Sequence, residues 1–379
     1  MNILDAPCPA RIQGIAGDIN VSWTEPIYTR SEVRHEGEWL RTLDIPVNSE
    51  IIKNWRSAHS WPLHHFYVSL RSRARKVNRN SLVSQRLKRL SSIHAKLRRE
   101  PHMKLNTMQD IAGCRAIMGT VEELNDLLNV YKAREFQHKF DYEKDYVSHP
   151  KASGYRSHHL IYKYSSATAA AYNDMRVEIQ CRTALQHAWA TALETVDLFT
   201  KQALKSSHGQ AEWERFFVLI SCAFAAKEHT APVPGVPEGR ELLQEICHLK
   251  ESLQVTSKLK SYKSYAEVLG LKQVQQQRPD TVLLQIQIGE NEASTILITG
   301  FRADEAPEAL AAYYQAETQG NSDAVLVSTA RTRNLKRAFP NYFADTDVFI
   351  REVDAIVSAP NGTAAKHVKS SAAHAATAL

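Results

Sequence analysis

The segment MRVEIQCRT, residues 175–183, constrains the fold most strongly, because its apolar and polar side chains alternate strictly. In an extended strand, successive side chains point to opposite faces. One face would carry Met175, Val177, Ile179 and Cys181, and the other would carry Arg176, Glu178, Gln180 and Arg182. The apolar face needs helices packed against it. The polar face is either solvated or the floor of a site for anions, and the pattern alone favours a solvated face.

The neighbouring segments predict a sheet that is surrounded by helices. CRAIMG at 114–119 and GYRSHHLIYKYS at 154–165 read as further strands, with a helix near 121–133 between them. Apolar spacing of three and four residues predicts helices over 184–199 and 210–227. The same spacing predicts that residues 47–100 are helical, with one stripe formed by Leu82, Leu87, Leu90, Ile93 and Leu97. The expected fold class is α+β or α/β, a mixed sheet with flanking helices, followed by a smaller C-terminal α/β domain.

The segment TAPVPGVPEG, residues 230–239, carries three prolines and two glycines and marks the clearest break in the chain. We therefore expect a main domain over 46–230 after an extension at 1–45. A helical connector follows at 231–270, and a small α/β domain of unknown role at 271–357. The Ala/Ser-rich end, 358–379, has no periodicity and is expected to be disordered.

Charge and cysteine usage narrow the classes of protein. Residues 71–99 contain eleven Lys or Arg and no Asp or Glu, which favours polyanionic ligands such as nucleotides or RNA. The five cysteines are scattered and form no CxxC pair, which argues against a disulfide scaffold or a zinc site. The N-terminus lacks a signal-peptide pattern, and the longest apolar run, FFVLISCAFAA, is too short to cross a bilayer. A cytoplasmic location without membrane contact is expected.

Two residue patterns suggest nucleotide chemistry. Tyr155 follows Gly154, so its ring can be accessible, and nearby cations suit a stacked base with phosphates. Asp110 precedes a predicted strand, where a carboxylate can hold Mg²⁺. Taken singly, Tyr155 is better explained by packing on the sheet and Asp110 by a turn or a helix cap. Together with Glu178 and the basic run, they indicate phosphoryl or pyrophosphoryl transfer, although no P-loop or kinase glycine loop is present.

Four motifs resemble the synthetase domain of the RelA/SpoT alarmone synthetases, in that family's order, over about residues 80–195. They are RLKRLSSIHAKL, DIAGCRAI, KDYVSHPKASGYRSHH and VEIQCRTALQHAWA. The resemblance implies a nucleotidyltransferase-like fold. It also implies transfer of pyrophosphate from ATP to the ribose 3′-hydroxyl of GDP or GTP, with Mg²⁺ as cofactor.

The resemblance also implies roles for individual residues. Arg86 and Arg115 would hold the adenine, and Lys88, Ser92 and Lys96 would contact the ATP phosphates from one helix. Asp110 would bind Mg²⁺, and Glu178 would act as general base and touch the metal. A base at Glu178 would need a raised pKa or a polarised hydroxyl to work at neutral pH. The acceptor nucleotide would be bound by Lys144, Lys151, Tyr155, His159, Gln180 and His187.

Three hypotheses remain open. The first is a stand-alone alarmone synthetase, because the His-Asp hydrolase motif and the ribosome-sensing domains of the long family members are not found in the sequence. The second is a toxic relative that pyrophosphorylates the 3′ end of tRNA, with the C-terminal domain as neutraliser or phage sensor. The third is an inactive nucleotide-binding or RNA-binding regulator, against which intact Asp110 and Glu178 count. Expected partners are ATP, GDP or GTP, with tRNA and a second copy of the chain as further candidates.

Overall fold

A single mixed sheet organises the protein. In the computed structural model, nine strands pair in the order β3-β4-β5-β2-β1-β9-β7-β8-β6 among the residues that the structure describes. These residues are 23–358 apart from 48, 134–135, 204–207, 265, 270–273, 275, 278, 289–293, 319–321, 330–335, 337–338 and 344. The predicted fold class, a mixed sheet with flanking helices, is confirmed. The first 22 residues and residues 359–379, which include most of the tail predicted to be disordered, lie outside the described part.

The elements have the following bounds. The strands are β1 Leu82–Leu87, β2 Ala112–Met118, β3 Lys139–Asp145, β4 His158–Lys163, β5 Arg176–Thr183, β6 Ala266–Leu269, β7 Thr281–Ile288, β8 Ser294–Phe301 and β9 Ser322–Thr329. The helices up to α6 are α1 Arg30–Thr42, α2 Glu50–Ala58, α3 Ser60–Val77, α4 Leu90–Arg99, α5 Val121–Lys132 and α6 Ala184–Ala203. The later helices are α7 His208–Glu228, α8 Gly239–Ser252, α9 Val255–Ser264, α11 Ala306–Thr318 and α13 Asp347–Ser358. Short 3-10 turns are η1 Leu105–Thr107, η2 Ala170–Tyr172, η3 Ala303–Glu305 and η5 Pro340–Phe343.

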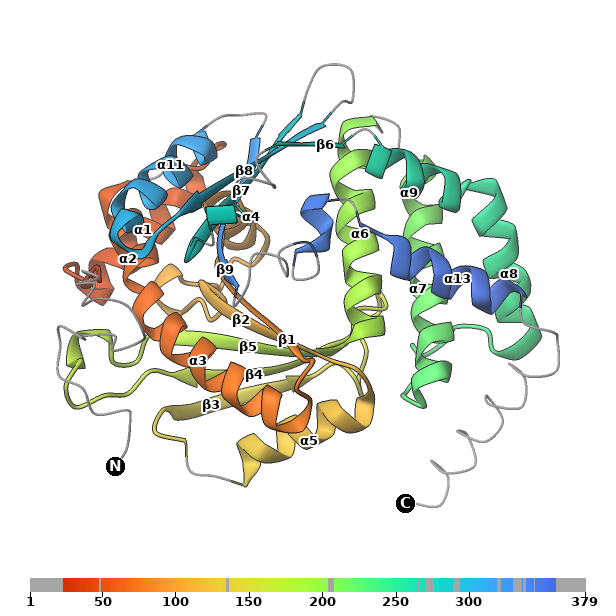
Figure 1. The fold of residues 1–379 in the computed structure, drawn as a ribbon, viewed down its shortest axis with the longest axis horizontal. Helices are drawn as coiled ribbons and strands as arrows, with labels where there is room; N and C mark the ends of the chain where they lie inside the picture. The colour runs from red at the N-terminus through yellow and green to blue at the C-terminus, as the bar shows by residue number, and fades with distance from the viewer. Residues whose placement is uncertain are drawn as a thin grey trace.

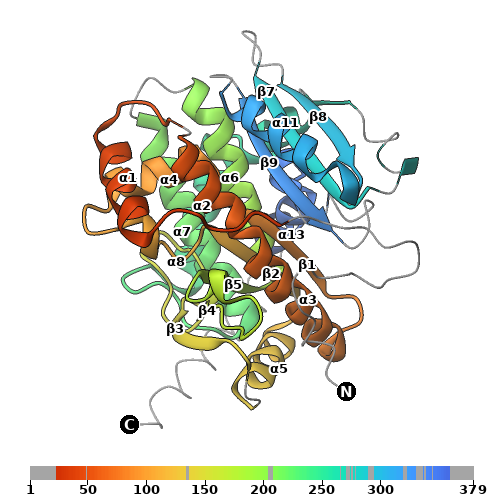
Figure 2. The same cartoon turned by 90° about the vertical axis from the view of Figure 1, so that its left-hand side faces the viewer.

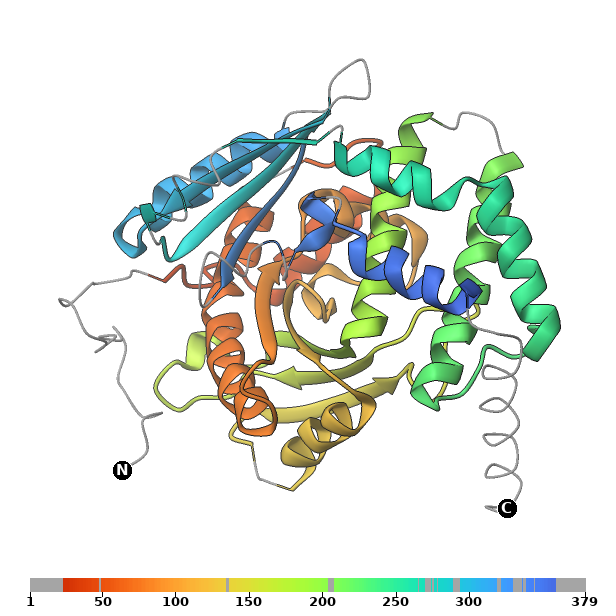
Figure 3. The same cartoon turned by 45° about the vertical axis from the view of Figure 1, so that its right-hand side comes forward.

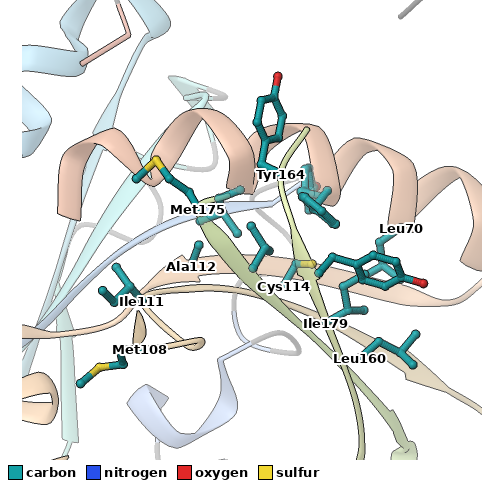
Figure 4. Packing of buried hydrophobic residues seen from close by; sticks show 14 of the residues in the cluster. Leu70, Met108, Ile111, Ala112, Cys114, Leu160, Tyr164, Met175 and Ile179 are labelled. Carbon is teal, nitrogen blue, oxygen red and sulfur yellow. The ribbon is translucent and has the colours of Figure 1, made fainter. Parts of the chain in front are cut away.

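The apolar face of the first five strands is covered by α3, which crosses the front of the sheet in Figure 1. Leu70 of α3 packs in one buried cluster with Cys114 of β2 and Ile179 of β5 (Figure 4). All four apolar residues predicted to share a face of β5 are buried. The alternation of this strand therefore specified correctly which side faces the core.

A second layer is a helical bundle of α6, α7, α8, α9 and α13, on the right of Figure 1. Trp189, Phe217 and Phe349 pack within its core, so the C-terminal helix α13 is joined to helices about 150 residues earlier. None of the helices in the described residues is both long and apolar enough to span a membrane. Cys114, Cys181, Cys222 and Cys247 are free thiols, and Cys8 lies in the undescribed N-terminal part.

The prediction of a continuous helix through residues 81–100 is wrong. Residues 82–87 form β1, and only α4, from residue 90, is helical. The strand pairs with β2 on one side and β9 on the other, from residues about 30 and 240 positions away. These distant partners outweigh the local apolar spacing, which fits a helix equally well. Strand β3 was not predicted, because its sequence KFDYEKD has little apolar alternation and it lies at the edge of the sheet.

The C-terminal strands continue the same sheet. Strand β9 pairs antiparallel with β1, with Ser84 opposite Thr329. Figure 3 shows the cyan and blue C-terminal strands above the orange and yellow-green strands, and α11 covers their outer side. The division into domains at 46–230, 231–270 and 271–357 stays a prediction, and the hydrogen-bonded sheet runs across it. The aromatic turn η5 packs as expected of an ordinary core, with Tyr342 and Phe343 buried against Leu82 and Ile117.

Candidate active site

Cross-strand pairing brings polar side chains from five strands into two rows on the face of the sheet opposite α3. Residues paired directly across a sheet point to the same side. The first row, from β3 to β1, is Lys144, His159, Gln180, Arg115 and Ser84. The second row, two residues along, places Glu178 and Arg86 on either side of Gly113. Six candidate residues that are distant in the sequence are thereby gathered on one surface.

Asp110 lies in the turn before β2 and is held by two lysines. Lys88 Nζ is 2.9 Å from Oδ2 and Lys96 Nζ is 3.0 Å from Oδ1. Burial lowers the pKa of Lys88, while the carboxylate of Asp110 opposes that shift. Lys88 belongs to the turn between β1 and α4, so the prediction that Lys88, Ser92 and Lys96 share one helix is wrong for Lys88. Ser92 lies on α4, about one turn before Lys96, and is partly exposed.

Glu178 is a buried carboxylate whose two oxygens each accept a hydrogen bond. His159 Nδ1 lies 2.9 Å from Oε1, and Gln180 Nε2 donates to Oε2 over 2.7 Å. Burial by itself would raise the pKa of Glu178. The hydrogen bond and charge of His159, with the contribution of Gln180, outweigh burial and hold this pKa below its usual range. A raised pKa, one of the two conditions given for a base at Glu178, is therefore not met, and Glu178 is ionised in this state.

The network around Glu178 continues to Tyr155 and Arg182. Tyr155 Oη lies 2.9 Å from His159 Nε2, and Arg182 Nη2 donates to Oη over 2.7 Å and to Gln180 Oε1 over 3.2 Å. Arg182 and Glu178 are 3% and 5% exposed, so the polar face of β5 is not solvated here. The prediction of a solvated face is wrong, because strand β4 and the loop before it enclose these side chains.

Tyr155 is half-buried, with cations close to its ring. Lys151 Nζ lies 5.2 Å from the ring centroid and also 4.7 Å from the ring of Tyr146. The Tyr146 and Tyr155 rings meet edge to face at 5.9 Å. Lys144 lies beside them, opposite His159 in the sheet, with Nζ 5.6 Å from the Tyr142 ring. This aromatic and cationic surface can bind a base and its phosphates.

The turn before Tyr155 requires glycine at position 154. Its φ is +85°, and a Cβ there would lie 2.8 Å from Ser221 Cβ. Ser221 Oγ donates to the Gly154 carbonyl over 2.6 Å and accepts from Arg156 Nε over 3.0 Å. Helix α7, which carries Ser221, therefore holds the loop that presents Tyr155.

Arg86 and Arg115 are diagonal neighbours on β1 and β2. Residues in this relation have Cα atoms about 7–8 Å apart, which leaves space for a flat ring between two guanidinium planes. Burial, followed by the nearby charges of Arg182 and Arg86, lowers the pKa of Arg115 to about 9. This surplus of positive charge is suited to an anionic ligand. His187 is buried in the first turn of α6, immediately after β5.

The part of the basic run that α3 carries lies apart from this surface. Helix α3 covers the apolar face of the sheet, so Arg71, Arg73 and Arg75 are carried on the opposite side from Glu178. Arg73 packs over the Tyr131 ring at 4.6 Å and donates to the Val130 carbonyl. This cation therefore has a structural role that its sequence context did not indicate.

The donor set is compatible with Mg²⁺. Glu178 lies on β5, and Asp110 lies in the turn that leads into the adjacent parallel strand β2. Two lysine ammonium groups already neutralise Asp110, whose side chain is 18% exposed and can be reached by an ion. Mg²⁺ commonly uses one or two carboxylates together with substrate phosphates and water. Within the described part of the chain, no three or more His, Cys, Asp or Glu side chains form a metal-binding group, so such a site would depend on the substrate.

Comparisons with known proteins find similar sequences for part of the chain. Residues 85–198 match a family model described as a region found in RelA / SpoT proteins. A stretch of 111 residues is 38% identical to GTP pyrophosphokinase YjbM of Bacillus subtilis, covering 29% of this chain and 52% of that protein. Another of 84 residues is 34% identical to GTP pyrophosphokinase YwaC of the same organism, covering 22% of this chain and 40% of that protein. The chain spans about two fifths to half of the length of these relatives.

Among solved structures, the chain is similar to the small alarmone synthetase 1 from Bacillus subtilis bound to its product pppGpp. The sequence identity is 26% and the TM-score is 0.39, with 45% of this chain and 89% of that chain covered.

Proposed function

We propose that the protein is a pyrophosphokinase, because residues 85–198 match the model of a region found in RelA / SpoT proteins. It transfers pyrophosphate from ATP to the ribose 3′-hydroxyl of GDP or GTP. The observation that carries the proposal is the position of Glu178. It lies on a polar face of the sheet that extends toward the Arg86–Arg115 pair on one side and toward Tyr155 and Lys144 on the other. Such an arrangement suits two nucleotides that bind on either side of a general base, Glu178.

The donor half is formed by β1, α4 and the turn before β2. Lys88 and Lys96 would exchange Asp110 for the phosphates of ATP, since ammonium groups pair readily with either anion. Asp110 and Glu178 would hold Mg²⁺, which neutralises charge on the transferred group when it is bound. Arg86 and Arg115 would enclose the adenine.

The acceptor half is formed by β3, β4, β5 and the loop at Tyr155. Tyr155 would stack on the guanine, and Lys144, Lys151 and His159 would contact the acceptor phosphates. A carboxylate with a depressed pKa accepts a proton weakly. If the acceptor hydroxyl replaces either His159 or Gln180 on Glu178, the ionised form loses part of its stabilisation and Glu178 becomes a stronger base.

The test uses ATP labelled at the β-phosphate, with Mg²⁺ and GDP or GTP. Purified protein should release AMP and form a labelled 3′-pyrophosphorylated guanosine nucleotide. Glu178→Gln should lower the rate by about 10²–10⁴-fold, because the amide cannot accept the proton. Undiminished activity in that variant would exclude Glu178 as the base. A wild-type protein that binds nucleotides without transfer would instead support the inactive regulator.

The acceptor is tested in competition, because a tRNA 3′ end remains the alternative substrate. Deacylated tRNA is added together with GDP and GTP, and the labelled product is identified. We expect label on the guanosine nucleotide, because the cations of α3 lie across the sheet from Glu178. Label on tRNA that survives charge removal at the exposed Arg75 and Arg79 would show that RNA is bound elsewhere than this run.

A further inference from the structure

Arg182 is the last arginine of β5 and is almost fully enclosed, at 3% exposure. One of its nitrogens, Nη2, makes both of its side-chain hydrogen bonds, to Tyr155 Oη at 2.7 Å and to Gln180 Oε1 at 3.2 Å. Its Nε and Nη1 are buried without a hydrogen-bond partner among the residues that the structure describes. Burying a guanidinium with so few partners costs free energy of folding, so stability alone does not account for this arginine.

The two bonds of Nη2 begin two routes that end on the same carboxylate. In the first, Arg182 holds Gln180 Oε1, which turns Gln180 Nε2 toward Glu178 Oε2 at 2.7 Å. An amide presents oxygen on one side and nitrogen on the other. Without Arg182, the Gln180 amide can rotate and place its oxygen against the Glu178 carboxylate, where it cannot donate.

The second route passes through the aromatic ring. Arg182 donates to Tyr155 Oη, which lies 2.9 Å from His159 Nε2 and thereby fixes the orientation of the imidazole. The other ring nitrogen of His159, Nδ1, is then directed at Glu178 Oε1 at 2.9 Å. Arg182 Cζ also lies 5.1 Å from the centroid of the Tyr155 ring, so the same guanidinium limits where that ring can move.

We propose that Arg182 is a positioning residue of the acceptor half, which orients Tyr155 and both donors to Glu178 through a single nitrogen. This inference rests on the proposed function for the roles of Tyr155 and Glu178. It assigns to Arg182 no contact with the donor nucleotide. Removal of Arg182 should therefore affect acceptor use and turnover but not the use of ATP.

The kinetic test compares Arg182→Met, Arg182→Lys and the control Arg176→Met. Arg176 lies on the same face of β5, but its guanidinium binds Asp141 and the Thr107 carbonyl. Arg182→Met should lower kcat by about 10–100-fold and raise KM for the acceptor, since small displacements of reacting groups slow catalysis strongly. KM for ATP should stay unchanged. Arg182→Lys, which can form one of the two bonds, should lie between Arg182→Met and wild type, and Arg176→Met should match wild type.

A structural measurement separates this inference from the proposed function. Crystal structures of wild type, Arg182→Met and Arg176→Met would report the Tyr155–His159 and Gln180–Glu178 contacts without any turnover. We expect both contacts to be lost in Arg182→Met only. If both persist there, the positioning role is overturned, whatever the activity. If they are lost but the wild type transfers no pyrophosphate, the positioning role stands and the proposed function fails. An equal rise in both KM values with normal kcat would also overturn the positioning role.

Discussion

At the scale of single residues, the two carboxylates of the candidate site are both fully engaged before any substrate binds. Each oxygen of Asp110 faces a lysine, and each oxygen of Glu178 faces a neutral or cationic donor. These hydrogen bonds and ion pairs offset the desolvation cost of holding two carboxylates on this face of the sheet. Substrate binding would then replace some of these partners and would not require a new charge to form on either carboxylate.

Asp110→Asn should lower activity by about 10²-fold or more and weaken the dependence on Mg²⁺, because a hard anionic oxygen is lost. Stability should also fall, because the buried Lys96 and the mostly buried Lys88 would both lose their anionic partner. The measurement is a Mg²⁺ titration of the transfer rate, with Asp126→Asn on the exposed side of α5 as control. An unchanged Mg²⁺ dependence would show that Asp110 does not bind the metal and only stabilises the turn.

Gly154→Ala should destabilise the fold by about 2 kcal/mol or more and lower activity, because the new methyl group would meet both strain at positive φ and Ser221. Gly235→Ala is a matched control, since Gly235 also has positive φ but no atom lies within 4 Å of the position that an alanine methyl group would occupy. We expect it to cost about 1 kcal/mol and leave activity intact. Chemical denaturation measures the free energy of unfolding of both variants, and the transfer assay measures their activity. Equal effects of the two substitutions would show that contact with Ser221 is unimportant.

At the scale of elements, histidines are buried beside α2 and α3. His59, between these helices, bonds to the Trp55 carbonyl through Nδ1, and the ring of His138 stacks on Phe66 at 4.5 Å. Figure 2 shows α2 close to α1, on the same side of the molecule as α4. Burial lowers the pKa of His59 and of His138 to about 4. These helices are therefore built around imidazoles that are neutral when the protein is folded.

The stability of the protein should fall as the pH is lowered from about 6.5 to about 4. In this window the unfolded chain binds protons at His59 and His138 that the folded chain excludes, so the stability present above pH 6.5 is lost progressively. Thermal unfolding between pH 7.5 and 4.5 measures the slope. His138→Asn should have a lower midpoint of thermal unfolding at every pH, but that midpoint should fall less steeply as the pH is lowered. The exposed His102→Asn should keep the wild-type slope. A wild-type slope in His138→Asn would contradict this assignment.

At the scale of the whole molecule, the C-terminal part is joined to the N-terminal half of the chain by more than strand pairing. Glu317 at the end of α11 pairs with the buried Arg56 of α2 at 2.9 Å, and the two side chains are 7% and 1% exposed. Glu317 Oε1 also accepts from the Leu90 backbone N–H at 2.8 Å, at the start of α4, and from Tyr313 at 2.6 Å. The same carboxylate thus caps the helix that carries Lys96. Cutting the chain near residue 255 would remove this cap and expose the edge of β1.

Glu317→Met should destabilise the protein by about 3–5 kcal/mol, because Arg56 would remain buried without its anion. The double variant Arg56→Met/Glu317→Met should recover much of that loss, since both desolvated charges are gone. Denaturant unfolding of wild type, both single variants and the double variant gives the coupling energy. If the losses of the two single variants simply add in the double variant, the pair contributes nothing beyond its packing.

The sequence by itself determined the local features of the protein. Alternation predicted β5 and which of its residues share a face, and apolar spacing predicted α5 and α6 nearly to their ends. Glu178 and Gln180 could be assigned to one surface for the same reason. The tertiary structure alone decided that residues 82–87 are a strand, that Arg182 is enclosed, and that Glu317 reaches Arg56 and Leu90. The reason is physical: periodicity reports which side chains of one segment face together, whereas pairing and burial depend on partners that lie up to about 260 residues away.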